Sequence, residues 1–460
     1  MMTRGFSLAS AWLLATLMVA IRPTDNSNFF AAANHATIDI DEDFEGKFED
    51  QLVMLADSPT DLEFSPDGKY LFVTQKEGRV FYTTVDELDS GDDVKPKLVF
   101  DVNVNYDLCF DGARGLSGIG VHPEFPAKPW IYLFHNHNKH GDCNAEVEKD
   151  GDEGPVNRLS RYVIDTNTMK IDPNSELVLF ETPPLYSSSH NSGDIAFGKD
   201  GKLYITVGDA GTRVKENADG VTMPQALDRL VGKIIRLNED GSIPSDNPYT
   251  GADSTRCNVN GLSGNPKIKC QEIYATGLRN PYRFAFNPNV DHTQFYINEV
   301  GRNMWERILP GGDDFRGANY GFPFRQGMCD TGKTEGSTCQ PSEFDDAIHW
   351  YRHDEEDGGA CTGGAFYPND AGWPADFEDA YFYAVSSLVT CMDGGVGEEL
   401  LCRGNITIVF EYQSHFTFLM VFFFLARMSS FIDIPLLITT GICLWWYHPY
   451  QSRWKGMCLP

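Results

Sequence analysis

The chain has 460 residues, with 66 acidic against 37 basic side chains and a formal net charge of -29. It is long enough to bury a sizeable core, and its charge would repel phosphate backbones and anionic lipid surfaces, which excludes nucleic acid as a partner. Length alone leaves two average domains or one large β-architecture open, so the domain count has to come from pattern.

Residues 1 to 36 read as a signal peptide and leader. Arg4 precedes an apolar run from Leu8 to Ile21, and small residues follow at 31 to 33. An uncleaved anchor is the alternative, but the run is short for a membrane span. We therefore expect secretion, and an oxidising compartment would let most of the eleven cysteines pair.

Residues 37 to 54 form an acidic leader. Asp39, Asp41 and Asp43 alternate as at the start of an EF-hand loop, but the glycine and the bidentate glutamate of that loop are absent. We expect a solvated segment rather than a calcium loop.

Between about residues 55 and 410, one strand-turn-strand unit recurs. Each copy has a short apolar alternation, a turn rich in Pro, Asp, Gly or Asn, and a second alternation rich in Tyr, Phe, Ile and Val. The copies lie at 61 to 82, 118 to 134, 194 to 211, 284 to 301, and 362 to 368 with 379 to 385. Such repetition predicts an all-β fold, a β-propeller with loop insertions. A β-sandwich or barrel is the alternative, but it does not explain the recurrence.

The stretch HNHNKHGDC at 135 to 143 gathers three histidines and a cysteine, His135, His137, His140 and Cys143. Such side chains could bind a transition metal. The spacing matches no fixed ligand pattern, so we favour a polar loop end.

His190 lies in SSSHNSG, just before a strand, and Asp209 lies in the GDAG turn after the next strand. Neighbouring strands can bring these side chains together, and the carboxylate would then orient the imidazole for use as a base. The alternative is that Asp209 only caps its own turn.

Two cysteine pairs are near in sequence within loops rich in Gly, Asn and Ser. They predict the disulfides Cys257–Cys270 and Cys329–Cys339. Because eleven is odd, at least one thiol is left over.

Two further loops could carry chemistry. Arg279 and Asn280 precede a proline at the start of an apolar strand, where a guanidinium could hold an anionic or carbonyl ligand or simply bond loop carbonyls. In NEVGRNMWERI, Glu299, Gly301 and Glu306 flank a turn whose carbonyls could bind calcium, although a turn without metal is the default.

Residues 411 to 460 form an atypical hydrophobic tail. The apolar runs at 416 to 447 are each too short to span a bilayer and are interrupted by two charges and a proline. The segment is open to three interpretations: a poor membrane anchor, a buried element, or sequence outside the ancestral fold. Asn405 lies in a glycosylation sequon.

Seven motifs in order resemble the glucose/sorbosone dehydrogenase family, over about residues 55 to 390. They are GLSGIGVHPEF, SHNSGDIAFGKDGKLYITVGDAG, LVGKIIRLNEDGSIPSDNPY, GLRNPYRFAFNP, EVGRNMWERI, GANYGFP and CTGGAFYP. That family includes soluble pyrroloquinoline-quinone (PQQ) aldose dehydrogenases and the extracellular domain of hedgehog-interacting proteins. The resemblance implies a six-bladed propeller of four-stranded antiparallel blades with a central site. Because it stops near Tyr383, we expect the last blade to be incomplete or replaced.

The resemblance also implies roles for individual residues. The general base falls on His190, its supporting acid on Asp209, and the quinone contacts on Arg279 and Asn280. In the implied reaction the base takes a hydroxyl proton from the sugar while hydride passes to PQQ, with Arg279 and calcium stabilising the charge on oxygen.

The carbonyls that hold calcium in the family fall on Gly301 and Arg302. Three departures stand beside this match. Ser192 replaces a glycine of the enzyme-type HNGG motif, Ala113 stands where a polar Gln or Glu is frequent, and no counterpart of the basic clamp for the quinone carboxylates follows Tyr383.

These features predict a secreted, PQQ- and calcium-dependent dehydrogenase that oxidises a sugar or polyol and passes electrons to an external acceptor. A membrane association would depend on the segment at 416 to 447. The alternative is a non-catalytic extracellular binding protein of the hedgehog-interacting type, favoured by Ala113, the EVGRNMWERI loop and the many cysteines.

Overall fold

The computed structural model describes residues 56–88, 94–145, 147–212, 215–258, 260–331, 343–353, 359–366, 368 and 381–383 in full, and the backbone alone at Val259. For the strands β1 (Leu17–Ala20), β2 (Gln51–Leu55), β26 (Arg403–Glu411), β27 (Thr439–His448) and β28 (Arg453–Cys458), and for the end of β25, it describes the backbone alone. The acidic leader, apart from β2, lies outside the described residues. Within them, helix is confined to α1 (Val85–Leu88), α2 (Val102–Tyr106) and short 3-10 turns.

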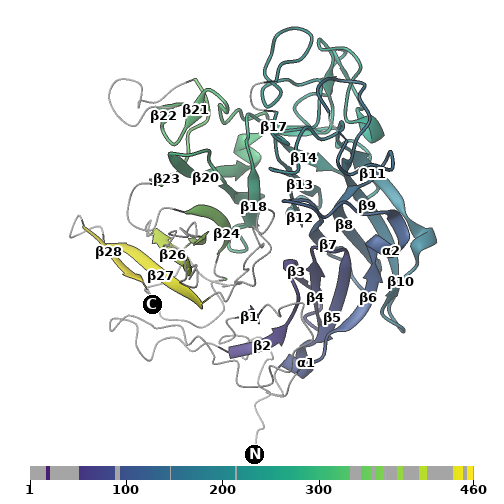
Figure 1. The fold of residues 1–460 in the computed structure, drawn as a ribbon, viewed down its shortest axis with the longest axis vertical. Coiled ribbons are helices and arrows are strands. Elements are labelled where there is room, and N and C mark those ends of the chain that lie inside the picture. The colour runs from purple at the N-terminus through teal and green to yellow at the C-terminus, as the bar shows by residue number, and fades with distance from the viewer. Residues whose placement is uncertain are drawn as a thin grey trace, which may run out of the picture.

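Four antiparallel sheets of at least four strands follow one another along the described chain (Figure 1). We call them blades 1 to 4. Blade 1 holds β3 (Pro59–Phe64), β4 (Tyr70–Gln75), β5 (Arg79–Thr84) and β6 (Lys97–Asp101). Blade 2 holds β7 (Leu116–Val121), β8 (Trp130–His137), β9 (Val156–Asp165) and β11 (Leu177–Glu181), with the short β10 (Lys170–Ile171) beside β9.

Blade 3 holds β12 (Ser192–Phe197), β13 (Leu203–Val207), β14 (Lys233–Leu237) and β17 (Ile273–Thr276). Blade 4 holds β18 (Pro281–Phe286), β19 (Gln294–Glu299), β20 (Trp305–Gly312) and β23 (His349–Arg352). A fifth sheet starts with β24 (Ala360–Phe366) and β25 (Tyr381–Ser386). The five recurring hairpins predicted from the sequence are confirmed as the first two strands of these five sheets.

The first strand of each sheet lies nearest the centre. β3 contacts β7, β7 contacts β12, β12 contacts β18, and β18 contacts β24, which gives the radial order of a propeller (Figure 1). All five strands also have a register shift near their start, where they pair with the second strand. A bulge repeated at one place indicates that the blades are versions of a single unit. The all-β propeller is therefore confirmed, with four complete blades in the described chain.

The Asp-Gly turns explain two of the hairpins. In blade 1 the amide of Gly68 donates to the carbonyl of Ser65 at 2.8 Å, and in blade 3 Gly201 donates to Gly198 at 2.9 Å. Both closing glycines have positive φ, 69° and 71°, which a residue without a Cβ adopts at low cost.

The core lies between the blades. One buried cluster joins Phe72 of blade 1 to Leu133 of blade 2, and a second joins Phe134 of blade 2 to Ile205 of blade 3. A third joins blades 3 and 4. Burying apolar surface gains about 25 cal/mol of free energy per Å². Neighbouring blades therefore stabilise one another through these interfaces.

The fifth sheet continues through β26, β27 and β28, with β26 and β27 parallel. Its backbone therefore includes parts of the expected atypical tail. At the other end β1, inside the expected signal segment, pairs with β2. Among the described residues no helix is long and apolar enough to cross a membrane.

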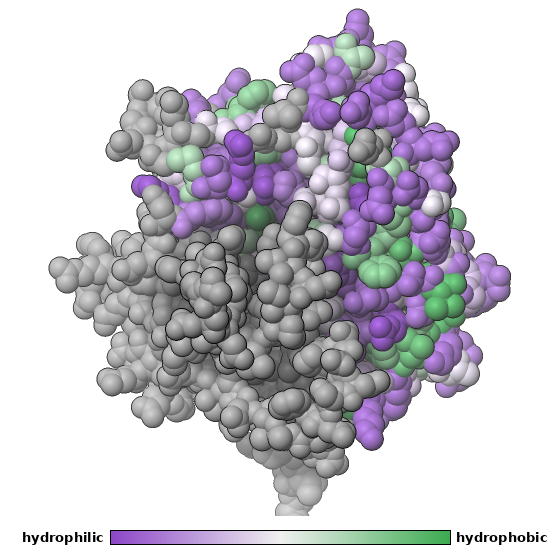
Figure 2. All heavy atoms as spheres, in the orientation of Figure 1, coloured by the Kyte–Doolittle hydropathy of each residue, from purple (hydrophilic) through white to green (hydrophobic). Residues whose placement is uncertain are grey.

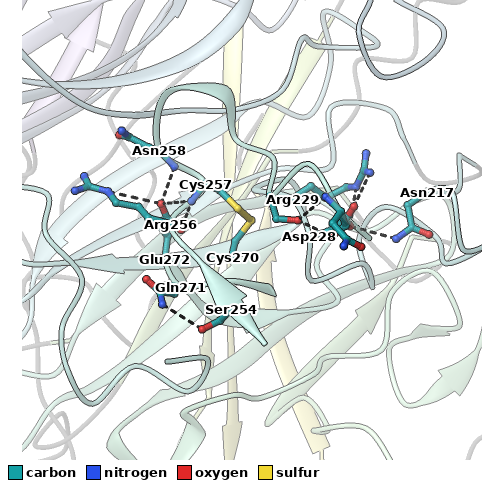
Figure 3. The surroundings of a disulfide bond; sticks show 12 residues. Asn217, Asp228, Arg229, Ser254, Arg256, Cys257, Asn258, Cys270, Gln271 and Glu272 are labelled. Atoms are coloured by element: carbon teal, nitrogen blue, oxygen red, sulfur yellow. Dashed lines mark hydrogen bonds and ion pairs between the residues drawn. A yellow bond between two sulfur atoms is a disulfide. The ribbon is translucent and has the colours of Figure 1, made fainter. Parts of the chain in front are cut away.

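Three disulfides involve described cysteines. Cys257–Cys270 is confirmed, and the carboxylate of Glu272 beside it accepts from the amides of Cys257 and Asn258 at 2.9 and 2.8 Å (Figure 3). Cys329 is also disulfide-bonded, and its predicted partner Cys339 lies outside the described residues. The third, Cys109–Cys143, was not predicted.

Candidate functional site

The loops predicted to carry chemistry meet at one mouth of the propeller, before the first residues of β12 and β18. Backbone hydrogen bonds join them: Asp209 donates to the carbonyl of Arg279 at 2.7 Å and Ala210 donates to that of His190 at 3.1 Å. Val300 donates to Asn280 at 3.0 Å. The structure thus brings together residues that are up to 110 positions apart, from blades 3 and 4.

His190 and Asp209 form a hydrogen-bonded pair. His190 Nδ1 lies 2.7 Å from Asp209 Oδ1, and the same oxygen accepts from the amide of Gly211 at 3.0 Å. With Nδ1–H as the donor to the carboxylate, Nε2 is the ring nitrogen left to accept a proton. Asp209 is fully buried while the His190 side chain is 23% exposed. This is the geometry of an oriented imidazole base, although Asp209 also stabilises its own turn.

Backbone strain is concentrated around this pair. Three residues that are not glycine have positive φ within two facing loops: His190 at 58°, Ser192 at 55° and Ala210 at 50°. Each such residue costs on the order of 1 kcal/mol or more, and such strain clusters at functional sites.

Ser192 is joined directly to a predicted cofactor residue. Its Oγ donates to Asn280 Oδ1 at 2.8 Å. Ser192 thereby fixes the orientation of the Asn280 side chain, with the carbonyl oxygen towards Ser192 and the amide nitrogen on the other side. The departure from the glycine of the enzyme-type motif therefore has a structural role that the sequence did not reveal.

Arg279 binds the loop that follows β19. Its Nη1 donates to the carbonyls of Val300 and Gly301 at 2.9 and 2.5 Å, and its amide donates to Glu299 Oε1 at 2.7 Å. The contact to loop carbonyls, which the sequence left open for Arg279, is present. Arg302 is exposed one residue further on.

The two glutamates of the same loop are buried and bonded within the protein. Glu299 Oε2 accepts from Arg307 Nε at 2.6 Å. Glu306 accepts from the amides of Gly301 and Cys361 at 3.0 and 2.9 Å and contacts His353 at 2.6 Å. Burial raises the pKa of Glu306 above its usual range, an effect that His353 partly offsets.

This arrangement does not fit a calcium ion on the Gly301 carbonyl. The Arg279 guanidinium already donates to that oxygen, so a second cation there would meet a positive charge at close range. Both nearby carboxylates also have partners already. Glu299 accepts from Arg279 and Arg307. Glu306 is bonded to Gly301, Cys361 and His353.

The donor set fits a quinone better than a calcium ion. Arg279 supplies positive charge and Asn280 supplies an oriented amide beside His190. Two buried acceptor oxygens in the same loops, Asn191 Oδ1 and Asp209 Oδ2, have no hydrogen-bond partner among the described residues. Unpaired buried acceptors are costly, and a hydroxyl-bearing ligand could satisfy them. Any clamp for the quinone carboxylates in the last blades lies outside the described residues.

The other metal candidates do not form sites in the described chain. Cys143 is in the disulfide with Cys109, and the His135 ring is fully buried in blade 2. Burial lowers the pKa of His135 well below its usual range, so this ring is neutral. His137 Nδ1 contacts the carbonyl of Tyr106 at 2.9 Å. His135 and His137 lie within β8, so the favoured interpretation of a polar loop end holds only for the residues after His137.

Fold and site together define a β-propeller with an oriented histidine at one mouth of its axis. The family model described as "Glucose / Sorbosone dehydrogenase" matches residues 56 to 384. The chain belongs to this family, as the resemblance predicted.

Three curated relatives show what the chain is similar to. It is 28% identical over 360 residues to HIPL1 protein of Arabidopsis thaliana, covering 66% of this chain and 48% of the relative. It is 29% identical over 229 residues to quinoprotein glucose dehydrogenase B of Acinetobacter calcoaceticus, covering 46% and 40%. It is 27% identical over 260 residues to hedgehog-interacting protein of Mus musculus, covering 53% and 33%. The matched region therefore spans about half or less of the length of these three relatives.

Among solved structures, the fold is similar to the soluble aldose sugar dehydrogenase of Escherichia coli in its apo form. The TM-score is 0.52 at 22% identity, with 72% of this chain and 80% of the other covered. This likeness shows the fold.

Proposed function

We propose that the protein is a secreted, quinone-dependent dehydrogenase that oxidises a hydroxyl group of a sugar or polyol. The observation that carries the proposal is the hydrogen bond between His190 Nδ1 and the buried Asp209 at 2.7 Å, in a strained loop beside Arg279 and Asn280. The family and the quinoprotein relative support the same chemistry. The disulfides and the N-terminal sequence support secretion.

His190 is the proposed general base. Asp209 fixes the tautomer with the proton on Nδ1, which leaves Nε2 to accept the proton of a substrate hydroxyl. The buried carboxylate also stabilises the imidazolium that forms. Because the hydrogen bond is preformed, little reorganisation is needed when the proton moves.

Arg279 and Asn280 would hold PQQ beside the base, with Ser192 orienting Asn280. When bound, PQQ supplies a carbonyl that accepts hydride from the sugar carbon. The positive charge of Arg279 stabilises negative charge on neighbouring oxygen atoms. We further propose six blades in the complete fold and an external electron acceptor. We assign no step to calcium, because the Gly301 carbonyl is engaged by Arg279.

A titration with PQQ tests the cofactor part of the proposal. Purified full-length protein should quench or shift the absorbance of PQQ at a defined stoichiometry, and Asn280→Ala should weaken this binding. Gln271→Ala, at a half-buried position in another loop of blade 3, is the matched control. A folded protein that leaves the PQQ spectrum unchanged would contradict the proposal.

The second candidate function is a non-catalytic extracellular binding protein. It is favoured by Arg279 occupying the loop carbonyls, by the exposed Ala113 where a polar side chain is frequent, and by the similarity to hedgehog-interacting protein. Under this alternative, PQQ does not bind and His190 variants leave partner binding unchanged.

A further inference from the structure

A cavity of about 550 Å³ lies at the far end of the innermost strands from His190. Its lining comes from β3, β7, β12, β18 and β24, so all five sheets contribute. His190 and Arg279 precede β12 and β18, whereas the cavity is lined by the later residues of these two strands. The cavity is therefore separate from the site described above.

Small and apolar side chains shape the cavity. Small residues in the wall leave the space open; they are Gly120, Ala196, Ala285 and Ala365. Beyond them stand aromatic side chains, Phe64, Phe197, Phe286 and Phe366. Prolines that come after the innermost strands of four sheets also line the cavity. Three of them, Pro66, Pro123 and Pro288, are exposed, so the cavity opens to solvent where these strands end. Such a lining suits an apolar body rather than a sugar.

The deep end of the cavity is charged and rigid. Asp61 accepts from the amide of Ile119 and Asp194 from that of Phe284, at 2.9 and 2.8 Å, so each carboxylate links two innermost strands. Arg283 of β18 donates to the carbonyls of Thr60 and Ser117, which lie in blades 1 and 2. The Arg283 side chain thus reaches across the centre.

Glu63 adds a third carboxyl to this cavity. It is half-buried in the wall and has no hydrogen-bond or ion-pair partner among the residues that the structure describes. Three carboxyls therefore face the single guanidinium of Arg283. Burial, reinforced by Asp61 and Asp194, raises the pKa of Glu63 well above its usual range. Arg283 alone does not balance three ionised carboxyls, so Glu63 keeps its proton in the empty cavity, and a cation bound beside it would favour the ionised form.

We propose that this cavity binds a small organic cation, with an ammonium group near Glu63 and an apolar body against the phenylalanine rings. Aromatic faces attract ammonium groups, and the attraction grows when water is excluded. A bare metal ion fits less well. In the described chain, only two groups of side chains bring their ligand atoms close enough to share an ion, and neither includes Asp61, Glu63 or Asp194. The proposal does not depend on the dehydrogenase function.

Calorimetric titration of the full-length protein with choline tests this proposal. The matched probe is 3,3-dimethyl-1-butanol, which has the same shape but no charge. We expect choline to bind at least about tenfold more tightly than the alcohol, because only choline can pair with the ionised form of Glu63. No binding of choline, or equal binding of the two probes, would overturn the proposal.

Three variants locate the binding. Glu63→Gln should abolish the preference for choline, whereas Glu153→Gln removes an equal charge from a carboxyl that is 79% exposed elsewhere and should preserve it. Ala285→Phe should fill the space and prevent binding of both probes, with thermal unfolding used to confirm that it folds. If choline binds equally to Glu63→Gln and wild type, the site is not this cavity. His190→Ala should leave choline binding unchanged, which separates this test from that of the dehydrogenase.

Discussion

At the scale of single residues, His190 is the side chain on which the proposed chemistry depends. We expect His190→Ala to lower kcat by about 100- to 10,000-fold, because a positioned general base contributes that much. Asp209→Asn should lower kcat by a smaller factor, since the imidazole remains but its tautomer is no longer fixed. Steady-state dye reduction measures both effects. Partial rescue of His190→Ala by added imidazole would show that the lost group is a base, and an unchanged kcat would contradict the assignment.

Ser192 offers a second test at this scale. Ser192→Ala keeps the Cβ at a position with a φ of 55° but removes the hydroxyl that holds Asn280. We expect the free energy of unfolding to fall by about 1 kcal/mol, the value of one hydrogen bond. Quinone binding should weaken more than stability does, as judged by titration beside urea unfolding. Unchanged quinone affinity would mean that Ser192 does not position Asn280.

Strand order permitted a contact between His190 and Asp209, and the resemblance to the family implied that the two act together. The sequence could not predict the Ser192 to Asn280 hydrogen bond, which depends on the path of two loops from different blades. The sequence also could not predict the partner of Arg279. Whether its guanidinium reaches the Gly301 carbonyl or a ligand depends on differences of a few ångströms in the loop positions.

At the scale of elements, the innermost strands pack so closely that some positions exclude even a methyl group. A Cβ at Gly118 of β7 would overlap the carbonyl oxygen of Gly193 in β12, whereas a Cβ at Gly363 of β24 meets nothing within 4 Å. We expect Gly118→Ala to lower the free energy of unfolding by about 1 to 3 kcal/mol, as overpacking does. Gly363→Ala is the matched control and should be neutral. Equal unfolding midpoints in urea for the two variants would contradict this packing.

Alternation of apolar residues and Asp-Gly turns made the five hairpins predictable. The shared bulge near the start of each innermost strand was not, because it follows from how the strands bend around the centre. The Cys109–Cys143 disulfide was also missed, since its partners are 34 positions apart and sequence does not fix connectivity.

At the scale of the whole molecule, the charge along the propeller axis makes stability depend on pH. Burial raises the pKa of Asp61 to about 7, with Asp194 adding to the effect and Arg283 opposing it. The folded state therefore keeps a proton that the unfolded chain releases near pH 4. This contribution to stability is present below pH 4 and is lost as the pH rises towards 7.

Asp61→Asn removes the carboxyl that titrates, so we expect the variant to lose less stability than wild type between pH 4.5 and pH 8. The unfolding free energy of the variant minus that of wild type should therefore be larger at pH 8 than at pH 4.5. Urea unfolding at both pH values measures it. A difference that is the same at both values would show that Asp61 does not titrate in this range.

The surface of the described residues is largely hydrophilic in the view of Figure 2, consistent with a strongly charged chain. The motifs predicted the family that the comparisons then showed.

The most direct test of the proposed dehydrogenase function is sugar oxidation by the full-length protein after incubation with PQQ. Dye reduction is followed with a panel of aldoses and polyols, for wild type and His190→Ala side by side. We expect saturable turnover by the wild type that requires both PQQ and sugar, and a rate at least about 100-fold lower for the variant. A folded wild-type protein that shows no turnover with any sugar, or a variant as active as wild type, would contradict the proposal.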